Sequence, residues 1–290
     1  MAAALRRLSC VPCRQSLVGL CCVLLVAAPT FAASANITDG WGRSVPVGDP
    51  PARIVSLSPH LTEALFALGV GDRISATVSF SDYPPEAAAV PRIGDAFALS
   101  REGLAAARAD LILAWGAALT PARLADLEAL GAVVYVSEPR SLAMVAEELD
   151  ALTRLTGASP TVAADFADRL ADRVAAIRNG QTPLRVLPLI SVRPPMTLSA
   201  EHFVGDILRH CGAVQPVSGR TGPVIRLSEE RLLTLEADLV LNLSGEALPA
   251  RLRLPAGVPV AELDPDLMVR PGPRVIEGTE QLCALLEALR

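Results

Sequence analysis

A segment with helix and strand signals occurs twice in this chain. When residues 99–113 are laid on residues 227–241, an offset of 128 positions without a gap, eight of the fifteen residues are identical. Each copy begins with Leu-Ser, carries a glutamate at its fourth residue, Glu102 or Glu230, and ends in Ala-Asp-Leu with further apolar residues. The alternative is a chance match, since helix–strand units share apolar positions. Eight identities in fifteen positions argue against chance, so the repeat predicts two similar lobes.

Short apolar runs alternate with longer helical stretches in the first half of the chain. The expected strands are residues 53–57, 74–78, 111–115 and 132–136. The expected helices are residues 62–68, 101–108 and 121–130. This alternation favours a parallel sheet covered by helices. The predicted fold class is therefore α/β, with two similar Rossmann-like lobes that have parallel-rich sheets and are bridged by one long α-helix.

A long helical region separates the two repeats. Residues 141–156 have a helical pattern, residues 157–160 interrupt it, and residues 161–177 form a second helix before a strand at 184–190. We expect an N-terminal lobe at 36–158, a bridging helix at 159–181 and a C-terminal lobe at 182–290. Ligand sites favour such interfaces between lobes. A helical connection is stiffer than a loop hinge, so we expect the lobes to open only slightly.

Residues 1–35 have the pattern of a signal peptide. Three arginines and no acid occur in the first fourteen residues, and residues 17–28 are apolar. This run is shorter than the roughly 20 residues that a membrane span needs. Small residues at 32–35 offer cleavage sites, although a retained anchor helix is the alternative. A lipid anchor at Cys21 is disfavoured because Leu20 stands where a small residue is required. The predicted location is the periplasm.

Charge and motifs exclude several classes of function. The net charge of the chain is −5, and it becomes about −8 without the three arginines of the leader. An acidic body without a basic cluster argues against nucleic acid as a partner. The three histidines, His60, His202 and His210, form no catalytic or metal-binding motif. An exported enzyme is thus the weaker alternative, and we predict no catalytic residue, no metal site and no cofactor.

Two cysteines remain outside the leader, Cys211 and Cys283. An even pair in an exported chain is a candidate disulfide, and two buried free thiols are the alternative. A metal site is disfavoured because no histidines stand at ligand spacing to complete a tetrahedral shell. A disulfide between them would close a long loop, which the chain-entropy model values at roughly 4 kcal/mol.

Several motifs point to a known family. They are Arg53-Ile-Val-Ser-Leu-Ser-Pro59, Ser81-Asp-Tyr-Pro-Pro85, Leu111-Ile-Leu-Ala-Trp115, Pro194-Pro-Met-Thr197, and Gly272-Pro-Arg-Val-Ile276 with Glu280-Gln-Leu-Cys283. The chain resembles the helix-bridged periplasmic binding proteins of ABC importers, which carry cobalamin, haem and ferric siderophores, and within them the cobalamin-binding members. The resemblance implies a carrier, expected to be a monomer, that delivers a small molecule to a permease dimer in the inner membrane.

The resemblance also assigns roles to particular residues. It implies that Cys211 and Cys283 form a disulfide in the C-terminal lobe. It implies that Glu102 and Glu230, one on each lobe, pair with arginines of the two-fold symmetric permease. A simpler role is open for both glutamates, because each would lie in the first turn of a helix after an N-cap serine, Ser100 or Ser228.

For the ligand, the resemblance implies a cleft lined by aromatic, polar and apolar side chains. The implied residues are Phe80, Phe97, Trp115, Met196, Asp266 and Arg270. The family has aromatic residues where this chain has Ala96 and Val224, so cobalamin, a related corrinoid or another flat metal chelate is expected. A haem carrier, with Tyr83 or Tyr135 on iron, is one alternative. A ferric-siderophore carrier, with Arg193 and Arg226 beside Arg270, is the other.

Overall fold

The computed structural model describes residues 36–95, 97–176, 181–217 and 222–290. The predicted leader and its cleavage site lie outside the described residues, as does Ala96. In the part of the chain that the structure describes, no helix is both long and apolar enough to span a bilayer.

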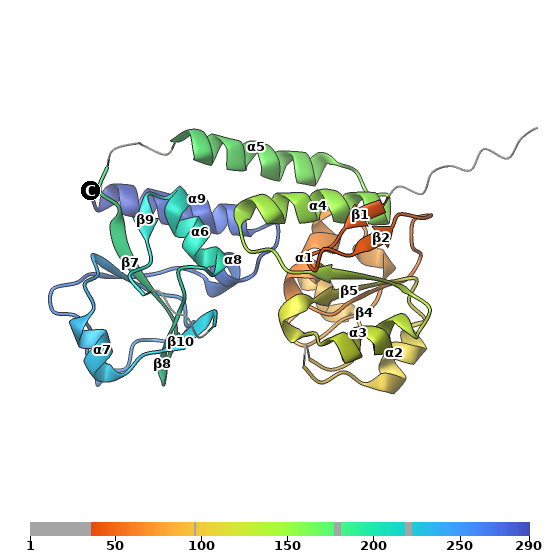
Figure 1. Cartoon of the computed structure of the whole chain (residues 1–290), viewed down its shortest axis with the longest axis horizontal. Helices are drawn as coiled ribbons and strands as arrows, with labels where there is room; N and C mark the ends of the chain where they lie inside the picture. The colour runs from red at the N-terminus through yellow and green to blue at the C-terminus, as the bar shows by residue number, and fades with distance from the viewer. Residues whose placement is uncertain (1–35, 96, 177–180, 218–221) are drawn as a thin grey trace, which may run out of the picture. The chain divides into compact units, whose positions relative to one another are not determined.

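The N-terminal lobe is a parallel sheet with helices on both faces (Figure 1). Its strands lie in the order β4-β3-β5-β6, and all three neighbouring pairs are parallel. The strands are β3 (Ile54–Ser56), β4 (Ile74–Ala76), β5 (Leu111–Trp115) and β6 (Val133–Ser137). The helices are α1 (Pro59–Ala67), α2 (Arg101–Ala107) and α3 (Pro121–Glu128), with 3-10 turns at Gly71–Arg73, Pro85–Ala89 and Gly116–Ala118. An antiparallel pair, β1 (Asn36–Thr38) and β2 (Ser44–Pro46), precedes them.

The C-terminal lobe repeats this plan and adds antiparallel strands. Its sheet has the order β10-β8-β7-β11-β12, and β9 pairs with β7 off this path. The strands are β7 (Leu184–Val192), β8 (Pro195–Leu198), β9 (Ala213–Val214), β10 (Val224–Arg226), β11 (Leu239–Asn242) and β12 (Val260–Glu262). The helices are α6 (Phe203–His210), α7 (Glu229–Thr234), α8 (Pro265–Val269) and α9 (Val275–Ala288). β7, β11 and β12 are parallel, whereas β8 pairs antiparallel with β7 and β10.

The internal repeat corresponds to matching elements. The first copy forms α2 and β5, and the second forms α7 and β11, with both strands in the middle of a parallel triplet. The helix starts also match, because Ser100 Oγ accepts the Gly103 N–H at 3.0 Å and Ser228 Oγ accepts the Arg231 N–H at 3.1 Å. The predicted fold class, two similar α/β lobes bridged by a helix, is confirmed.

Helix α5 (Thr161–Ala176) is the bridging helix. It packs on α4 (Leu142–Thr156) and on α9, as Figure 1 shows. Arg169 of α5 donates two hydrogen bonds to the Glu280 carboxylate of α9, at 3.0 and 2.7 Å. The bounds proposed for this bridge, 159–181, stay a prediction, and residues 177–180 lie outside the described residues.

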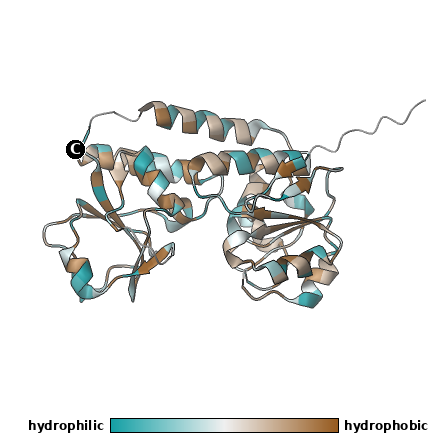
Figure 2. Ribbon diagram, in the orientation of Figure 1, coloured by the Kyte–Doolittle hydropathy of each residue, from teal (hydrophilic) through white to brown (hydrophobic). Residues whose placement is uncertain are grey.

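The bridge is reinforced by a hydrophobic core that continues from one lobe into the other. One buried cluster contains Leu152 of α4, Phe166 of α5, Ile207 of α6 and Leu282 of α9. A second cluster lies on the other face of the N-terminal sheet and a third on the other face of the C-terminal sheet. Figure 2 shows hydrophobic residues along the strands. The connection is thus a four-helix junction, which supports the expectation of limited opening.

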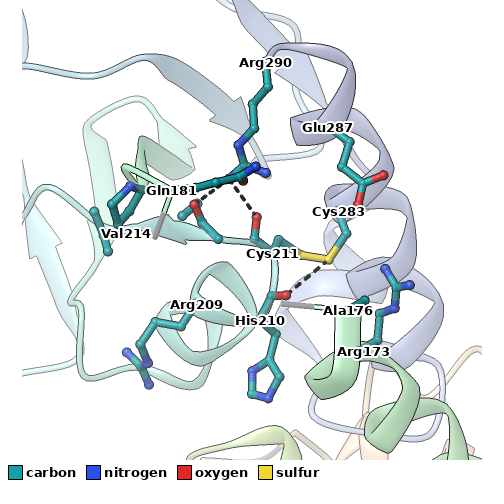
Figure 3. Close-up of a pocket in the computed structure, with 13 residues that line it drawn as sticks. Arg173, Ala176, Gln181, Arg209, His210, Cys211, Val214, Cys283, Glu287 and Arg290 are labelled. Atoms are coloured by element: carbon teal, nitrogen blue, oxygen red, sulfur yellow. Dashed lines mark hydrogen bonds between the residues drawn. A yellow bond between two sulfur atoms is a disulfide. The ribbon is translucent and has the colours of Figure 1, made fainter. Parts of the chain in front are cut away.

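Cys211 and Cys283 form a disulfide, which joins the end of α6 to α9 (Figure 3). The two residues are 72 positions apart. Both side chains are buried. The bond therefore closes a loop that contains the whole C-terminal sheet apart from β7 and β8.

Removing the disulfide should destabilise the fold. The double variant Cys211→Ser/Cys283→Ser should lose roughly 2–4 kcal/mol of unfolding free energy, mainly because its unfolded chain is less restricted. Denaturant unfolding followed by circular dichroism measures this. A reductant should lower the midpoint of the wild type and leave that of the variant unchanged. Equal midpoints for oxidised wild type and variant would contradict the prediction.

Candidate ligand-binding site and docking surface

The aromatic side chains implied for the ligand follow the carboxyl ends of strands in the N-terminal sheet. Trp115 is the last residue of β5, and Phe80 follows β4. In open α/β sheets this edge is where ligands bind. The rings of Phe97 and Trp115 meet edge to face, with centroids 6.4 Å apart and planes at 65°. The structure therefore brings two of the three predicted aromatic residues into contact.

Phe80 and Phe97 belong to neighbouring loops. The Ser79 N–H donates to the Gly94 carbonyl at 2.8 Å, and Asp95 Oδ1 accepts the Phe97 N–H at 2.7 Å. Phe80 is 74% exposed and Phe97 69% exposed. Phe80 also has a φ of 65°, a left-handed conformation that is costly for a residue with a bulky side chain. An exposed aromatic ring held in a strained conformation is typical of a contact surface.

Asp266 and Arg270, the polar residues implied for the ligand, are paired at α8. Arg270 Nη2 lies 2.9 Å from Asp266 Oδ2. Burial raises the pKa of the Asp266 carboxyl, while Arg270 opposes that shift. Met196 is half-buried in β8, where it lies opposite Arg226 of β10. Among the described residues, no ring contact or hydrogen bond joins the Phe97–Trp115 pair to Asp266, Arg270 or Met196.

Arg270 also reaches acidic residues of the N-terminal lobe. Its Nη1 donates to Glu63 Oε1 at 2.8 Å and to Asp82 Oδ1 at 3.0 Å. Arg274 makes a two-pronged contact with the same glutamate, from Nε to Oε2 and from Nη2 to Oε1, both at 2.8 Å. We call this set, Glu63, Asp82, Asp266, Arg270 and Arg274, the inter-lobe ion cluster.

The inter-lobe ion cluster holds its arginines firmly charged. Burial opposes the charge of Arg270, but the hydrogen bonds that it donates to Glu63 and Asp82 outweigh burial and raise the pKa of that guanidinium. The hydrogen bonds of Glu63 likewise raise the pKa of Arg274. The Arg274 guanidinium also lies 3.6 Å from the centre of the Tyr83 ring. Both arginines are therefore cations whose partners are already in place.

Sequence reasoning missed Glu63 and Arg274 as members of this cluster. Both had signals. Glu63 is the one acid in the apolar helix α1, and Arg274 belongs to the C-terminal motif that carries the family resemblance. Asp82 and Tyr83 come from the Ser81–Pro85 motif in the same way. What was not visible is that these segments, some 190 to 210 positions apart, meet.

The candidate docking residues, Glu102 and Glu230, are exposed in the first turns of α2 and α7. Figure 1 shows both helices on the side of the molecule opposite α5. The Ser100 hydroxyl donates a hydrogen bond to Glu102 Oε2 at 3.1 Å. The pKa of the Glu102 carboxyl is lowered, mainly by a hydrogen bond from its own backbone N–H and next by the bond from Ser100. Helix capping and partner docking are compatible roles, because the outer carboxylate oxygens stay accessible to solvent.

Two of the histidines, His60 and His202, and Tyr135 are fully or partly buried. His60 is buried between two hydroxyls, with Nδ1 2.7 Å from Ser58 Oγ and Nε2 2.9 Å from Ser137 Oγ. Burial, with a smaller effect of Arg270, lowers its pKa to about 3. Burial lowers the pKa of His202 to about 4 and raises that of Tyr135. In the described part of the chain, no three metal-ligating side chains gather at one point.

A cavity of about 450 Å³ lies beside the disulfide, lined by the basic residues Arg173, Arg209, His210 and Arg290 (Figure 3). Two of the arginines already have partners. Arg290 Nη2 donates to the Gly212 carbonyl at 2.7 Å, and Arg209 pairs with Asp206 at 3.0 Å. Positive side chains near the carboxyl end of α6 complement its carbonyl groups. The end of α6 thus accounts for the positions of Arg209 and Arg290 beside the cavity.

Comparison with known proteins agrees with this architecture. The chain is 31% identical over 250 residues to the vitamin B12-binding protein of Vibrio cholerae, which covers 82% of this chain and 90% of that protein. It is 27% identical over 249 residues to that of Yersinia pseudotuberculosis, with 82% and 87% covered.

Solved structures of periplasmic binding proteins also superpose on this chain. The periplasmic vitamin B12-binding protein BtuF of Vibrio cholerae superposes with a TM-score of 0.73 at 30% identity, covering 83% of this chain and 98% of that one. The periplasmic haem-binding protein BhuT, in complex with two haems, superposes with a TM-score of 0.70 at 25% identity, covering 82% and 99%. The family model described as "Periplasmic binding protein" matches residues 54–249. With two matching α/β lobes, a bridging helix and these relatives, the chain belongs to the periplasmic binding protein family.

Proposed function

We propose that this protein is a periplasmic carrier that binds cobalamin or a related corrinoid between its lobes and delivers it to the permease of an ABC importer. The observation that carries the proposal is the Phe97–Trp115 ring pair at the carboxyl edge of the N-terminal sheet, in a chain similar to vitamin B12-binding proteins over most of its length. Export would use the leader at residues 1–35, with cleavage between Ala32 and Ala35.

The residues around the site suit a corrinoid in two ways. The exposed rings of Phe80 and Phe97, with the half-buried ring of Trp115, offer apolar surface for the flat face of a macrocycle. Asp266 and Arg270 offer an acceptor and a donor for the amide groups at its rim. A mostly apolar wall with a few polar groups that fix orientation is the usual composition of a small-molecule site.

The charges of the inter-lobe ion cluster favour a corrinoid over haem. The cluster holds three carboxylates and two guanidinium groups, a formal charge of −1. The two propionates of haem would meet arginines whose charge is already balanced, and the cluster's net negative charge would repel them. The amide groups of a corrinoid are uncharged and would not be repelled. The tyrosines considered for iron are also engaged, since Tyr83 lies under Arg274 and Tyr135 is buried. Of the arginines considered for a siderophore, Arg193 is already paired with Glu246 at 2.8 Å, as Arg270 is with its own carboxylates.

Docking on the permease would use Glu102 and Glu230. They occupy equivalent repeat positions, one on each lobe, and both are exposed. Two matched carboxylates suit a partner with two-fold symmetry. Exposed ion pairs add little affinity each but set orientation and association rate.

Calorimetry against cobalamin, cobinamide, haemin and a ferric hydroxamate tests the ligand class. We expect a corrinoid to bind with a Kd of about 1 μM or below, which corresponds to roughly 8 kcal/mol. Haemin and the hydroxamate should bind more weakly. No heat with either corrinoid, or tighter binding of haemin, would contradict the proposal.

Phe80 should matter for the ligand and little for the fold. Phe80→Ala should weaken corrinoid binding about tenfold or more, since the loss of a contacting aromatic ring costs on the order of 1.5 kcal/mol. Phe80→Gly should show the same loss of affinity and unfold at an equal or higher denaturant concentration than Phe80→Ala, because glycine relieves the positive φ. Leu130→Ala, which also removes an exposed apolar side chain, is the control and should bind as the wild type does. Unchanged affinity in both Phe80 variants would remove this residue from the site.

Reversal of charge at both candidate docking residues should separate binding from transport. Glu102→Arg/Glu230→Arg should bind corrinoid as the wild type does, yet fail to support uptake into vesicles that contain its permease, because like charges would then face each other. The control, Glu86→Arg/Glu201→Arg, makes the same change of net charge at two other exposed glutamates. It should support normal uptake. Loss of ligand affinity in the first variant, or equal uptake by both, would refute the docking role.

A further inference from the structure

Glu63 lies where the two lobes touch. It contacts Nη1 of Arg270, whereas Asp266 contacts Nη2 of the same guanidinium. We propose that Glu63 is a positioning residue that fixes the angle between the lobes in the ligand-free protein and aims Arg270 at the ligand. The second half of this inference rests on the proposed function, whereas the first half does not.

The geometry around Glu63 is that of an anchor. Its side chain is 1% exposed, on helix α1 of the N-terminal lobe. Its two oxygens accept three N–H groups, one from Arg270 and two from Arg274, each at 2.8 Å. A single buried carboxylate thus binds two cations that the other lobe presents just before and at the start of α9. Charge-assisted hydrogen bonds of this kind are strong and directional.

Arg270 depends on this anchor for its orientation. Its Nη1 is shared between Glu63 and Asp82, and its Nη2 faces Asp266. Asp82 and Asp266 are substantially exposed, at 61% and 38% of their side chains, so water competes for them. Glu63 is the fully buried one of the three carboxylates. Without its charge, the guanidinium would be free to turn between two solvated partners.

The contact also depends on close approach of the two backbones. A methyl group added at Gly272, which lies between the two arginines, would come within 3.2 Å of the His60 carbonyl oxygen in α1. Beside this contact is a cavity of about 340 Å³, lined by residues of α1, α5 and α9 that include Glu63 and Arg274. Open space next to a tight contact lets α1 and α9 shift relative to each other once the ion pairs are broken.

Pulsed electron spin resonance on the full mature protein tests the first half. Nitroxide labels at Ala106→Cys in α2 and Leu233→Cys in α7, both exposed, report the distance between the lobes without any ligand. Glu63→Gln keeps the shape of the side chain and removes its charge, and we expect it to broaden the distance distribution. Gly272→Ala should broaden it by wedging the same contact apart. A distribution identical to that of the parent in both variants would overturn the inference.

A double-mutant cycle tests the second half. Glu63→Gln should weaken binding of cobalamin or cobinamide, whichever binds the wild type, by roughly tenfold, the effect of about 1.4 kcal/mol. If Glu63 acts through Arg270, Glu63→Gln/Arg270→Gln should bind no more weakly than Arg270→Gln alone. Additive losses would show a general structural effect and overturn the positioning role. Wild type that binds neither corrinoid would refute the proposed function, while the distance measurement would still test the anchor.

The matched control is Glu280→Gln. This variant also removes one negative charge from an ion pair, in this case the pair of Glu280 with Arg169 that joins α9 to α5. Glu280 has no ion pair with Arg270 among the described residues. It should keep the affinity of the wild type. An equal loss of affinity in Glu280→Gln would mean that any weakened contact at the junction has this effect, and it would overturn a specific role for Glu63.

Discussion

The two lobes share one hydrophobic core, to which α4, α5, α6 and α9 all contribute, and the positions of the candidate ligand residues depend on it. Separating the lobes there would expose apolar surface at a cost of about 25 cal/mol per Å². A hydrogen bond from the Leu142 N–H at the start of α4 to Asp206 of α6 adds direction to this packing. We therefore expect the junction to restrict opening, and restricted motion lowers the free energy that a protein loses when it orders a binding site.

A hydrophobic contact alone does not fix an angle, because apolar packing is not directional. We infer that the inter-lobe ion cluster adds further directional contacts, since Nε and Nη2 of Arg274 both donate to one buried carboxylate. The charges of the inter-lobe ion cluster also bear on the ligand. Since both arginines of the cluster are already paired, the polar wall of the site is close to neutral and suits a ligand with amides better than one with carboxylates. One set of contacts would in this way set both the lobe angle and the ligand class.

Much of the architecture could be predicted from the sequence. The 128-residue repeat identified the α2–β5 and α7–β11 units before any coordinates, because caps and apolar strand patterns are local signals. The family resemblance supplied the Cys211–Cys283 pairing. The antiparallel strands β8 and β10 were not foreseen, since Pro194 and a three-residue β10 give weak strand signals.

The candidate site was less predictable for a physical reason. Its contacts join segments that are far apart in sequence, such as Glu63 with Arg274, and periodicity carries no information about such pairs. Phe97 and Trp115 could be chosen as aromatic residues, but their edge-to-face contact depends on the Asp95 turn. The resemblance implied that Asp266 and Arg270 line the ligand cleft, which stays a prediction. The ion pair between Arg270 and Glu63 of the other lobe appeared only in three dimensions.

Tryptophan fluorescence tests most directly whether a corrinoid binds against Trp115. The chain has two tryptophans, and the other, Trp41, donates to Glu138 at 2.8 Å. In Trp41→Phe the emission comes from Trp115 alone, and a bound corrinoid, which absorbs in the range of that emission, should quench it. We expect quenching by cobalamin or cobinamide that saturates at one equivalent. Emission that changes only in proportion to added corrinoid, without saturation, would contradict it.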